Sequence, residues 1–169
     1  MVIFTPKSLL RSPVATSDAR ELTTGRFSKV IDDERFVAAP GSARRIVFCS
    51  GKLYYDLIAE CERRWPDQPG PIAIVRVEQL YPWPADEIDR VISKYPSAGT
   101  VVWSQEEPEN MGGWGFLHDR LRDALRSGQE LFHASRSEAA STAVGSIRIH
   151  RDEQRALVNK ALAGVDGEE

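Results

Sequence analysis

Four short apolar runs, separated by longer amphipathic segments, constrain the fold of this chain more than any other feature. The runs occupy residues 46–49, 72–77, 100–103 and 131–134. A continuous apolar run of this length is typical of a strand buried on both faces of a parallel sheet. The sequence therefore predicts four buried strands.

The segments between and after these runs carry apolar residues at helical spacing. Such stripes run through residues 53–61, 88–95, 114–125 and 157–162. Strands that alternate with helices across short turns predict an α/β fold. We expect three layers, with a mostly parallel sheet and helices on both faces. Ligands of such sheets meet the loops at the carboxyl ends of the strands.

The chain is expected to form a single domain over residues 1–169, with its main α/β unit at 45–163 and a less regular segment at 1–44. Four short pieces are expected in that segment: a strand at 2–4, a helical turn at 7–11, a helix at 19–22 and an extended stretch at 27–31. Because the first residues lead straight into a strand, the chain resembles a domain cut from a longer polypeptide.

Charge and cysteine usage exclude several classes of protein. The net charge is −3 with both signs mixed, which is unlike the basic stripe of a nucleic-acid-binding protein. Cys49 and Cys61 form no disulfide framework, and no apolar run approaches the roughly 20 residues that span a bilayer. A reducing, cytoplasmic setting without membrane or nucleic-acid partners fits these features.

Two clusters of residues are candidates for binding a phosphate-bearing anion. Lys7 and Arg11 are four positions apart, so one helical turn places both on one side. Ser50 and Lys52 follow a strand and precede a helix, where backbone amides favour anions. The alternatives are a solvated turn for the first cluster and a plain strand-to-helix turn with Ser50 as N-cap for the second.

Arg44 and Arg45 precede the same strand that Ser50 follows. They are therefore expected at the opposite end of the strand, away from Ser50 and Lys52. There they remain candidates for binding an anion from another surface.

A polar segment at residues 105–110 directly follows the third predicted strand. Glu106 and Glu107 are adjacent, and adjacent residues on an extended chain point opposite ways, so they are poor partners for acid/base chemistry. An interface with a neighbouring domain or a second subunit, formed with Asn110 and Trp114, is one interpretation. A simple turn and helix entry is the other.

No catalytic residue and no metal site is expected in this chain. His118, His133 and His150 are scattered and have no cysteine or carboxylate at metal-ligand spacing. The residue patterns alone lead to an α/β domain with possible anion-binding loops.

Four segments together resemble one family. They read VIFTPKSLLR at 2–11, VFCSGKLYYD at 47–56, IVRVEQLYPWP at 74–84 and WSQEEPENMGGW at 103–114. In this order they are similar to the C-terminal domain of the decarboxylating subunit of 2-oxoglutarate dehydrogenase. The ending, with Ala143–Gly145, Ile149, His150 and Gln154, also fits this family.

The resemblance implies a transketolase-type C-terminal domain that follows two larger domains holding thiamine diphosphate and magnesium. The whole enzyme would decarboxylate 2-oxoglutarate oxidatively, in the tricarboxylic acid cycle, and pass a succinyl group to a lipoyl group of a partner acyltransferase. This chain lacks the Gly-Asp-Gly cofactor motif, so by itself it is expected to bind no cofactor and to be inactive. Its implied role is assembly of a homodimer of the full subunit.

Regulation is a second implication of the resemblance, because related domains can bind an adenine nucleotide or acyl-CoA. AMP or acetyl-CoA is the implied effector, and Lys7, Arg11, Arg44 and Arg45 are its candidate phosphate contacts. One departure concerns residues 134–138, which lack the Gly-Arg-Pro-like turn of many members. Partner docking at that loop is therefore in question.

Two other functions remain open at this point. One is a stand-alone module that binds a nucleotide or acyl-CoA, and the other is the equivalent domain of a different thiamine-diphosphate enzyme. The strings EQLYPWP and QEEPENMGGW favour the 2-oxoglutarate enzyme over other thiamine enzymes.

Overall fold

A five-stranded sheet forms the centre of the protein, with strands in the order β1-β3-β2-β4-β5. The computed structural model describes Val2 and residues 5–165. The four long strands run parallel: β2 (Arg45–Cys49), β3 (Ile72–Val77), β4 (Thr100–Pro108) and β5 (Glu130–Arg136). At one edge, β1 (Val30–Ile31) pairs antiparallel with β3. The predicted α/β class with a mostly parallel sheet is confirmed.

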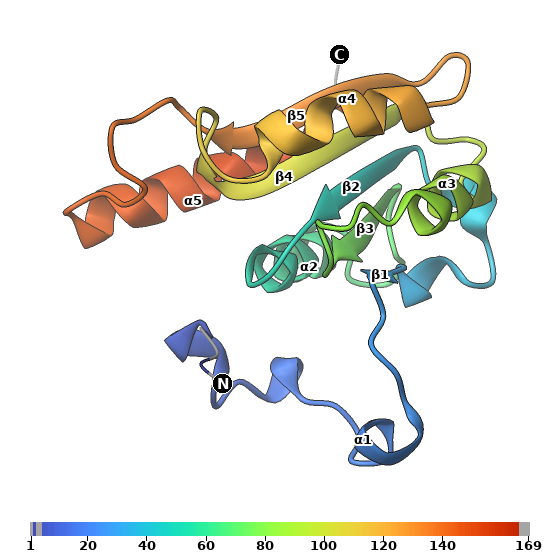
Figure 1. Ribbon diagram of the computed structural model, residues 1–169, viewed down its shortest axis with the longest axis horizontal. Coiled ribbons are helices and arrows are strands. Elements are labelled where there is room, and N and C mark those ends of the chain that lie inside the picture. The colour runs from blue at the N-terminus through green and yellow to red at the C-terminus, as the bar shows by residue number, and fades with distance from the viewer. Residues whose placement is uncertain (1, 3–4, 166–169) are drawn as a thin grey trace.

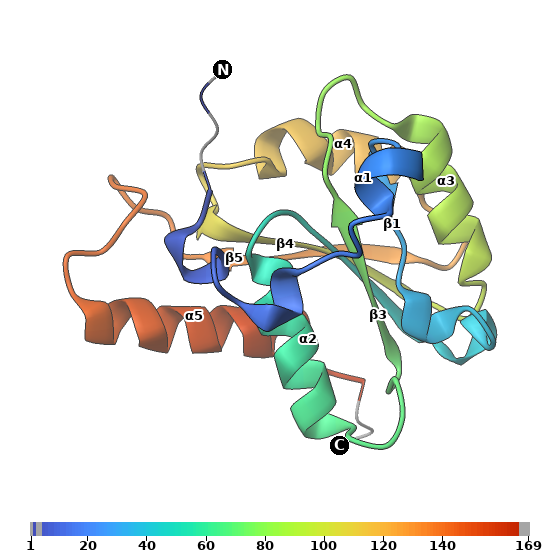
Figure 2. The ribbon, with the colours of Figure 1, turned by 90° about the horizontal axis from the view of Figure 1, so that it is seen from below.

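Helices cover both faces of the sheet, as the apolar stripes predict. Helices α2 (Leu53–Arg64) and α5 (Ile147–Ala161) pack on one face, and α3 (Ala85–Lys94) and α4 (Trp114–Ala124) pack on the other. The two layers lie on opposite sides of the strands in Figure 1 and Figure 2.

Each strand contributes side chains to both layers because successive residues point to opposite faces. Val47 packs with the α2 and α5 side chains, whereas Phe48 packs with those of α3 and α4. Both residues are fully buried, and burial of such a side chain stabilises the fold by about 1.5–3 kcal/mol. This double burial explains why the strands read as continuous apolar runs.

Residues 5–29 form an arm that extends from the main body, below β1 and α2 in the view of Figure 1. It contains short turns at Lys7–Leu9 and Pro13–Ala15 and the four-residue helix α1 (Glu21–Thr24), and none of its residues is buried. The turn predicted at 7–11 is therefore present, and the helix predicted at 19–22 begins two residues later. The strand predicted at 2–4 lies outside the described residues except for Val2, which is not in a strand.

A buried carboxylate fastens the chain to the sheet where the arm ends. Asp33 is 5% exposed, and its Oδ2 lies 2.6 Å from Nη2 of Arg35 and accepts a hydrogen bond of 2.8 Å from the N–H of Ile74 on β3. Nearby, the hydroxyl of Tyr95 donates to Asp32 over 2.6 Å. These contacts tie the segment after β1 to the sheet and to the end of α3.

Strands β4 and β5 are longer than predicted, and β5 gains one residue at its start and two at its end. β4 continues to Pro108, so the turn expected at residues 105–110 is wrong for its first half. The reason is a partner strand: after an irregularity between Ser104 and Pro108, Pro108 pairs with Arg136 of β5. The polar composition of this stretch hides the strand, because pairing of its end with β5 depends on backbone groups and needs no run of apolar side chains.

Candidate functional site at the carboxyl edge of the sheet

A chain of polar contacts crosses the carboxyl edge of the sheet. Nζ of Lys52 lies 2.6 Å from Glu106 Oε1 on β4 and 3.2 Å from Asp56 Oδ2 on α2. Nε2 of Gln154, on α5, donates to the same Asp56 oxygen over 2.8 Å. Nη2 of Arg136, at the end of β5, donates to Gln154 Oε1 over 2.8 Å. We call these five residues the carboxyl-edge network.

Lys52 is held as a cation between two carboxylates. Burial opposes its charge, but Glu106 and Asp56 outweigh this and raise the pKa of the ammonium. An anion that binds Lys52 must compete with both carboxylates. The role of Lys52 in anion binding stays a prediction.

Ser50 does not cap α2. Lys52 is the N-cap residue and no side chain closes this helix end, so the interpretation of Ser50 as N-cap is wrong. Gly51 has φ of 62°, a conformation that favours glycine, and it turns the chain between the two residues. Ser50 instead lines a cavity of about 330 Å³, which we call the edge cavity, together with Tyr81, Glu107 and Phe116.

The arm covers a groove of about 800 Å³ between α2 and α5, which we call the arm groove. Its walls include Ser8, Leu9 and Ser12 from the arm, Lys52 and Arg63 from α2, and His150, Arg151 and Arg155 from α5. Asp56 and Glu60 supply the acidic lining. Basic groups outnumber acidic ones in this groove, which favours an anionic ligand.

Lys7 and Arg11 flank the arm residues that line this groove. Both are exposed, and neither forms an ion pair with any residue that the structure describes. The predicted turn therefore brings its neighbours Ser8 and Leu9 to the groove and leaves the two cations available beside it.

Arg44 and Arg45 lie at the opposite edge of the sheet, as predicted from the strand direction. Nη1 of Arg45 donates to the carbonyl oxygen of Ala161 over 3.1 Å, at the carboxyl end of α5, and burial lowers the pKa of the Arg45 guanidinium. The backbone of Arg44 bonds to Pro71 and Gly99. The structure does not bring this pair together with Lys7, Arg11, Ser50 or Lys52.

Gln105 organises the loop after β4, and sequence reasoning missed its role. It is 3% exposed, and its Oε1 accepts from the Trp103 indole N–H over 2.9 Å and from the Trp114 backbone N–H over 3.0 Å. Its Nε2 donates to the carbonyls of Pro108 and Met111 over 3.1 and 2.7 Å. The signal that the sequence offers is a glutamine two positions after the apolar run of residues 100–103.

The four residues predicted for an interface do not gather at one site. Glu106 faces Lys52 and α2, whereas Glu107 is exposed and lines the edge cavity. Asn110 makes two hydrogen bonds with the backbone of Ala139, of 3.0 and 3.2 Å. The Trp114 ring stacks on His133 with centroids 4.7 Å apart.

An exposed aromatic surface lies next to the edge cavity. Tyr81 is 81% exposed and packs edge-on against Phe116, with centroids 6.4 Å apart. The Arg120 guanidinium lies 3.8 Å from the centroid of the Phe116 ring. Exposed aromatic and arginine side chains of this kind are enriched in protein–protein interfaces.

The described part of the chain holds no group of three His, Cys, Asp or Glu residues that could bind a metal ion. Within the same residues, no helix is both long and apolar enough to cross a membrane.

Comparison with known proteins places these features in a family. A family model described as 2-oxoglutarate dehydrogenase C-terminal matches residues 16–162. The 2-oxoglutarate dehydrogenase E1 component of Cupriavidus necator is 40% identical over 167 residues, which cover 99% of this chain and 17% of that protein. The E1 components of Geobacillus kaustophilus and Coxiella burnetii are each 40% identical over 162 residues, covering 96% of this chain and 17% of theirs.

The chain thus spans 17% of the length of the relatives that it matches. The matched family region covers β1 to β5 and all of α2 to α5, and it includes the carboxyl-edge network. The chain belongs to the family of 2-oxoglutarate dehydrogenase C-terminal domains.

Proposed function

We propose that this chain serves as the C-terminal domain of a 2-oxoglutarate dehydrogenase E1 component, and that it contributes assembly rather than chemistry. The observation that carries the proposal is the extent of the match. Nearly all of this chain matches E1 components, yet the match spans 17% of their length. A piece of that size depends on the rest of the enzyme for a complete active site.

The proposed reaction of the whole enzyme is oxidative decarboxylation of 2-oxoglutarate, followed by transfer of the succinyl group to a lipoyl group of a partner acyltransferase. Thiamine diphosphate with magnesium would supply the carbanion-stabilising chemistry when bound. The described residues offer no cluster that suits magnesium. We therefore assign cofactor binding to the domains that would precede this one, in a homodimer of the full subunit located in the cytoplasm.

The exposed surface around Tyr81 and Phe116 is the proposed contact with those domains. It lies at the carboxyl edge, beside Glu107 and the loop that Gln105 organises. Trp114 adds a half-buried aromatic residue next to it. This assignment keeps Glu107 and Trp114 in the predicted interface, whereas Glu106 and Asn110 act within the domain.

A chimeric enzyme tests the proposal. The matching C-terminal region of the Cupriavidus necator E1 component would be replaced by this chain, and 2-oxoglutarate-dependent reduction of an artificial electron acceptor would be measured. We expect no activity from this chain alone or from the truncated relative, and activity from the chimera. Activity from this chain alone would contradict the proposal, and a folded but inactive chimera would favour a stand-alone binding module.

The arm groove supports a second proposed role, which is binding of an effector such as AMP or acetyl-CoA. Four cationic side chains line it, and Lys7 and Arg11 stand exposed beside it. Phosphate groups bind such clusters through charge-assisted hydrogen bonds. Arg44 and Arg45 are left out of this proposal because they lie at the other edge of the sheet.

Arg11→Ala tests this role by calorimetric titration with AMP and with acetyl-CoA. We expect the affinity to fall about tenfold, as for loss of one charge-assisted hydrogen bond. Arg20→Ala is the matched control, because Arg20 belongs to the same arm but, unlike Arg11, does not adjoin a residue that lines the groove. Equal affinities of both variants and the unchanged chain would remove the site assignment.

A further inference from the structure

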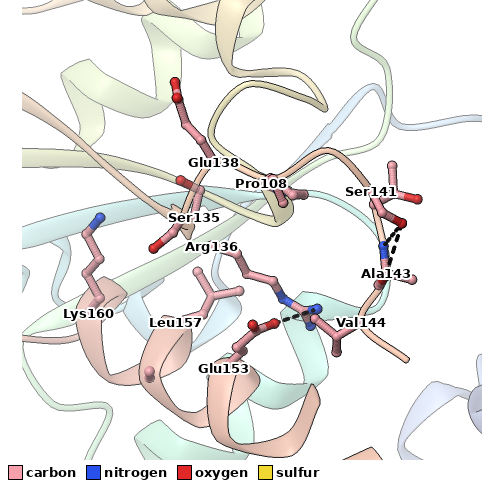
Figure 3. A pocket seen from close by; sticks show the side chains of 14 residues that line it. Pro108, Ser135, Arg136, Glu138, Ser141, Ala143, Val144, Glu153, Leu157 and Lys160 are labelled. Carbon is pink, nitrogen blue, oxygen red and sulfur yellow. Dashed lines mark hydrogen bonds and ion pairs between the residues drawn. The ribbon is translucent and has the colours of Figure 1, made fainter. Parts of the chain in front are cut away.

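A separate pocket of about 360 Å³ lies between α5 and the loop of residues 137–146, and we call it the loop pocket (Figure 3). Its rim includes Pro108 from β4, and its walls include Leu157 and Lys160 from α5. Arg136 is the one residue that lines this pocket and also belongs to the carboxyl-edge network. The loop pocket shares no lining residue with the arm groove or the edge cavity, so it is distinct from both.

Hydrogen bonds hold the loop in place over the pocket. The side-chain amide of Asn110 donates to the carbonyl of Ala139 over 3.0 Å and accepts from the Ala139 N–H over 3.2 Å. Farther along, the Ser141 hydroxyl donates to the carbonyl of Ala143 over 3.1 Å. The small residues of this loop, mostly Ser and Ala, leave space between the loop and α5.

Two opposite charges of the pocket are not neutralised within the protein. Arg136 is paired with Glu153, with Nη1 and Oε2 3.4 Å apart. Lys160 and Glu138, in contrast, form no ion pair with each other or with any other residue in the described part of the chain. Figure 3 shows Lys160 extending from α5 and Glu138 from the loop, with Ser135 between them in that view.

Two buried polar atoms of the pocket residues also have no partner among the described residues. Ser135 is 9% exposed and its Oγ makes no hydrogen bond. The Arg136 side chain is 8% exposed, and its Nε makes none although both Nη atoms are engaged. Buried polar groups without partners are uncommon in native proteins and cost free energy. Each of these two atoms has less than 1 Å² of accessible surface, so a ligand atom reaches it only when the loop shifts.

We propose that the loop pocket binds a free α-amino acid whose side chain ends in a carboxylate or an amide. Lys160 binds the α-carboxylate and Glu138 binds the α-ammonium group. The side-chain oxygen accepts a hydrogen bond from Ser135 Oγ or Arg136 Nε, after a small movement of the loop. Leu157 and Val144 line the pocket with the apolar surface that the methylene groups need.

Charge balance and size separate this ligand from a nucleotide. Arg136 and Lys160 are matched by Glu138 and Glu153, so the pocket is neutral overall and does not favour a multiply charged anion. A volume of about 360 Å³ is at the lower end of ligand pockets, which range from about 300 to 1,000 Å³. It suits one amino acid. The proposal concerns this chain alone and does not depend on dehydrogenase activity.

Calorimetric titration of the 169-residue chain tests the proposal. L-glutamate and L-glutamine are the probes, glutarate lacks the ammonium group, and L-alanine lacks the side-chain oxygen. We expect glutamate or glutamine to bind, and glutarate and alanine to bind at least about tenfold more weakly. Absence of binding by both probes up to about 10 mM, or equal binding of glutarate, would overturn the proposal.

Variants locate the binding to the pocket. Lys160 and Glu138 are both exposed. The substitutions Lys160→Met and Glu138→Gln are each expected to lower the affinity for the probes at least about tenfold. Arg90→Met and Glu21→Gln are the matched controls, because these exposed residues do not line the pocket. Thermal melting checks that all four variants fold. Equal loss in pocket and control variants would also overturn the assignment.

Discussion

The arm of residues 5–29 and the sheet unit of residues 45–162 are held by different kinds of contact. Within residues 5–28, every hydrogen bond between described residues joins positions no more than four apart. In the sheet unit, Arg45 bonds to Ala161, 116 positions away, and Gln154 bonds to Asp56, 98 positions away. Leu22 and Phe27 of the arm are 90% and 69% exposed, whereas the central strands β2 and β3 are buried on both faces.

The arm and the sheet unit also differ in how firmly they are held. Local hydrogen bonds shape the arm, but burial does not anchor it, whereas α2 and α5 are anchored by their packing on the sheet. The arm groove therefore has one firmly held wall and one weakly held wall. A ligand in the groove would add long-range contacts to residues 5–28, whose hydrogen bonds are all local. Mutations in the two regions are expected to differ in their effect on stability.

The largest loss of stability is expected from Trp103→Ala in the sheet unit. Trp103 is 1% exposed and its indole N–H is bonded to Gln105, so truncation removes buried apolar surface and leaves a cavity. The free energy of unfolding should fall by about 3–5 kcal/mol. Urea denaturation followed by circular dichroism measures this change, and a loss below about 1 kcal/mol would contradict the packing described.

Asp33→Ala tests the junction between the two regions and should cost about 3 kcal/mol. The change removes the ion-pair partner of the half-buried Arg35 guanidinium and the acceptor of the Ile74 N–H. Asp18→Ala is the matched control in the arm, where the carboxylate accepts only one exposed backbone hydrogen bond. Urea denaturation should show a smaller loss for the control, and similar losses would mean that the junction is not anchored by Asp33.

Gln105→Ala should lower the free energy of unfolding by about 2 kcal/mol, because several buried donors and acceptors lose their partner. Gln68→Ala provides a control on an exposed turn. Trp fluorescence should change with Gln105→Ala alone, since both Trp103 and Trp114 bond to this side chain. An unchanged spectrum would speak against its organising role.

A smaller effect with a defined pH dependence is expected at Glu60. Hydrogen bonds from Arg63, followed by those from Arg64, lower the pKa of this carboxyl from its usual 4.5 to about 2. A lowered folded-state pKa gives stabilisation that is present above pH 4.5 and is lost as the pH falls toward 2. Glu60→Gln should cost about 0.5–1 kcal/mol at pH 7 and almost nothing near pH 2. Thermal melting across this range would show a pH-independent difference if the ion pairs contribute nothing.

The smallest effect is expected in the arm itself. Leu22→Ala removes a side chain that is 90% exposed, and the free energy of unfolding should change by less than about 0.5 kcal/mol. Hydrogen exchange gives an independent measurement. The Leu22 amide should exchange far faster than the Val47 amide in the centre of the sheet. Equal protection at the two sites would remove the contrast between the regions.

Local patterns in the sequence were sufficient for most of the fold. The apolar runs predict β2 and β3 to within one residue, and the apolar stripe predicts the start of α2, because strand and helix periodicity are properties of neighbouring residues. The extension of β4 through Gln105 to Pro108 was missed, since it depends on pairing with β5 about 30 positions later. For the candidate site, strand direction placed Arg45 correctly at the edge away from Ser50.

By itself, the sequence determined the α/β class, the order of its elements and the family to which the chain belongs. Tertiary structure alone decided what the charged residues do. It placed Lys52 between two carboxylates, turned Arg45 into a contact for the end of α5, and brought Arg136, Glu138 and Lys160 around one pocket. The physical reason is that periodicity is local, whereas the pairing and burial of a charge depend on which distant segments the fold brings together.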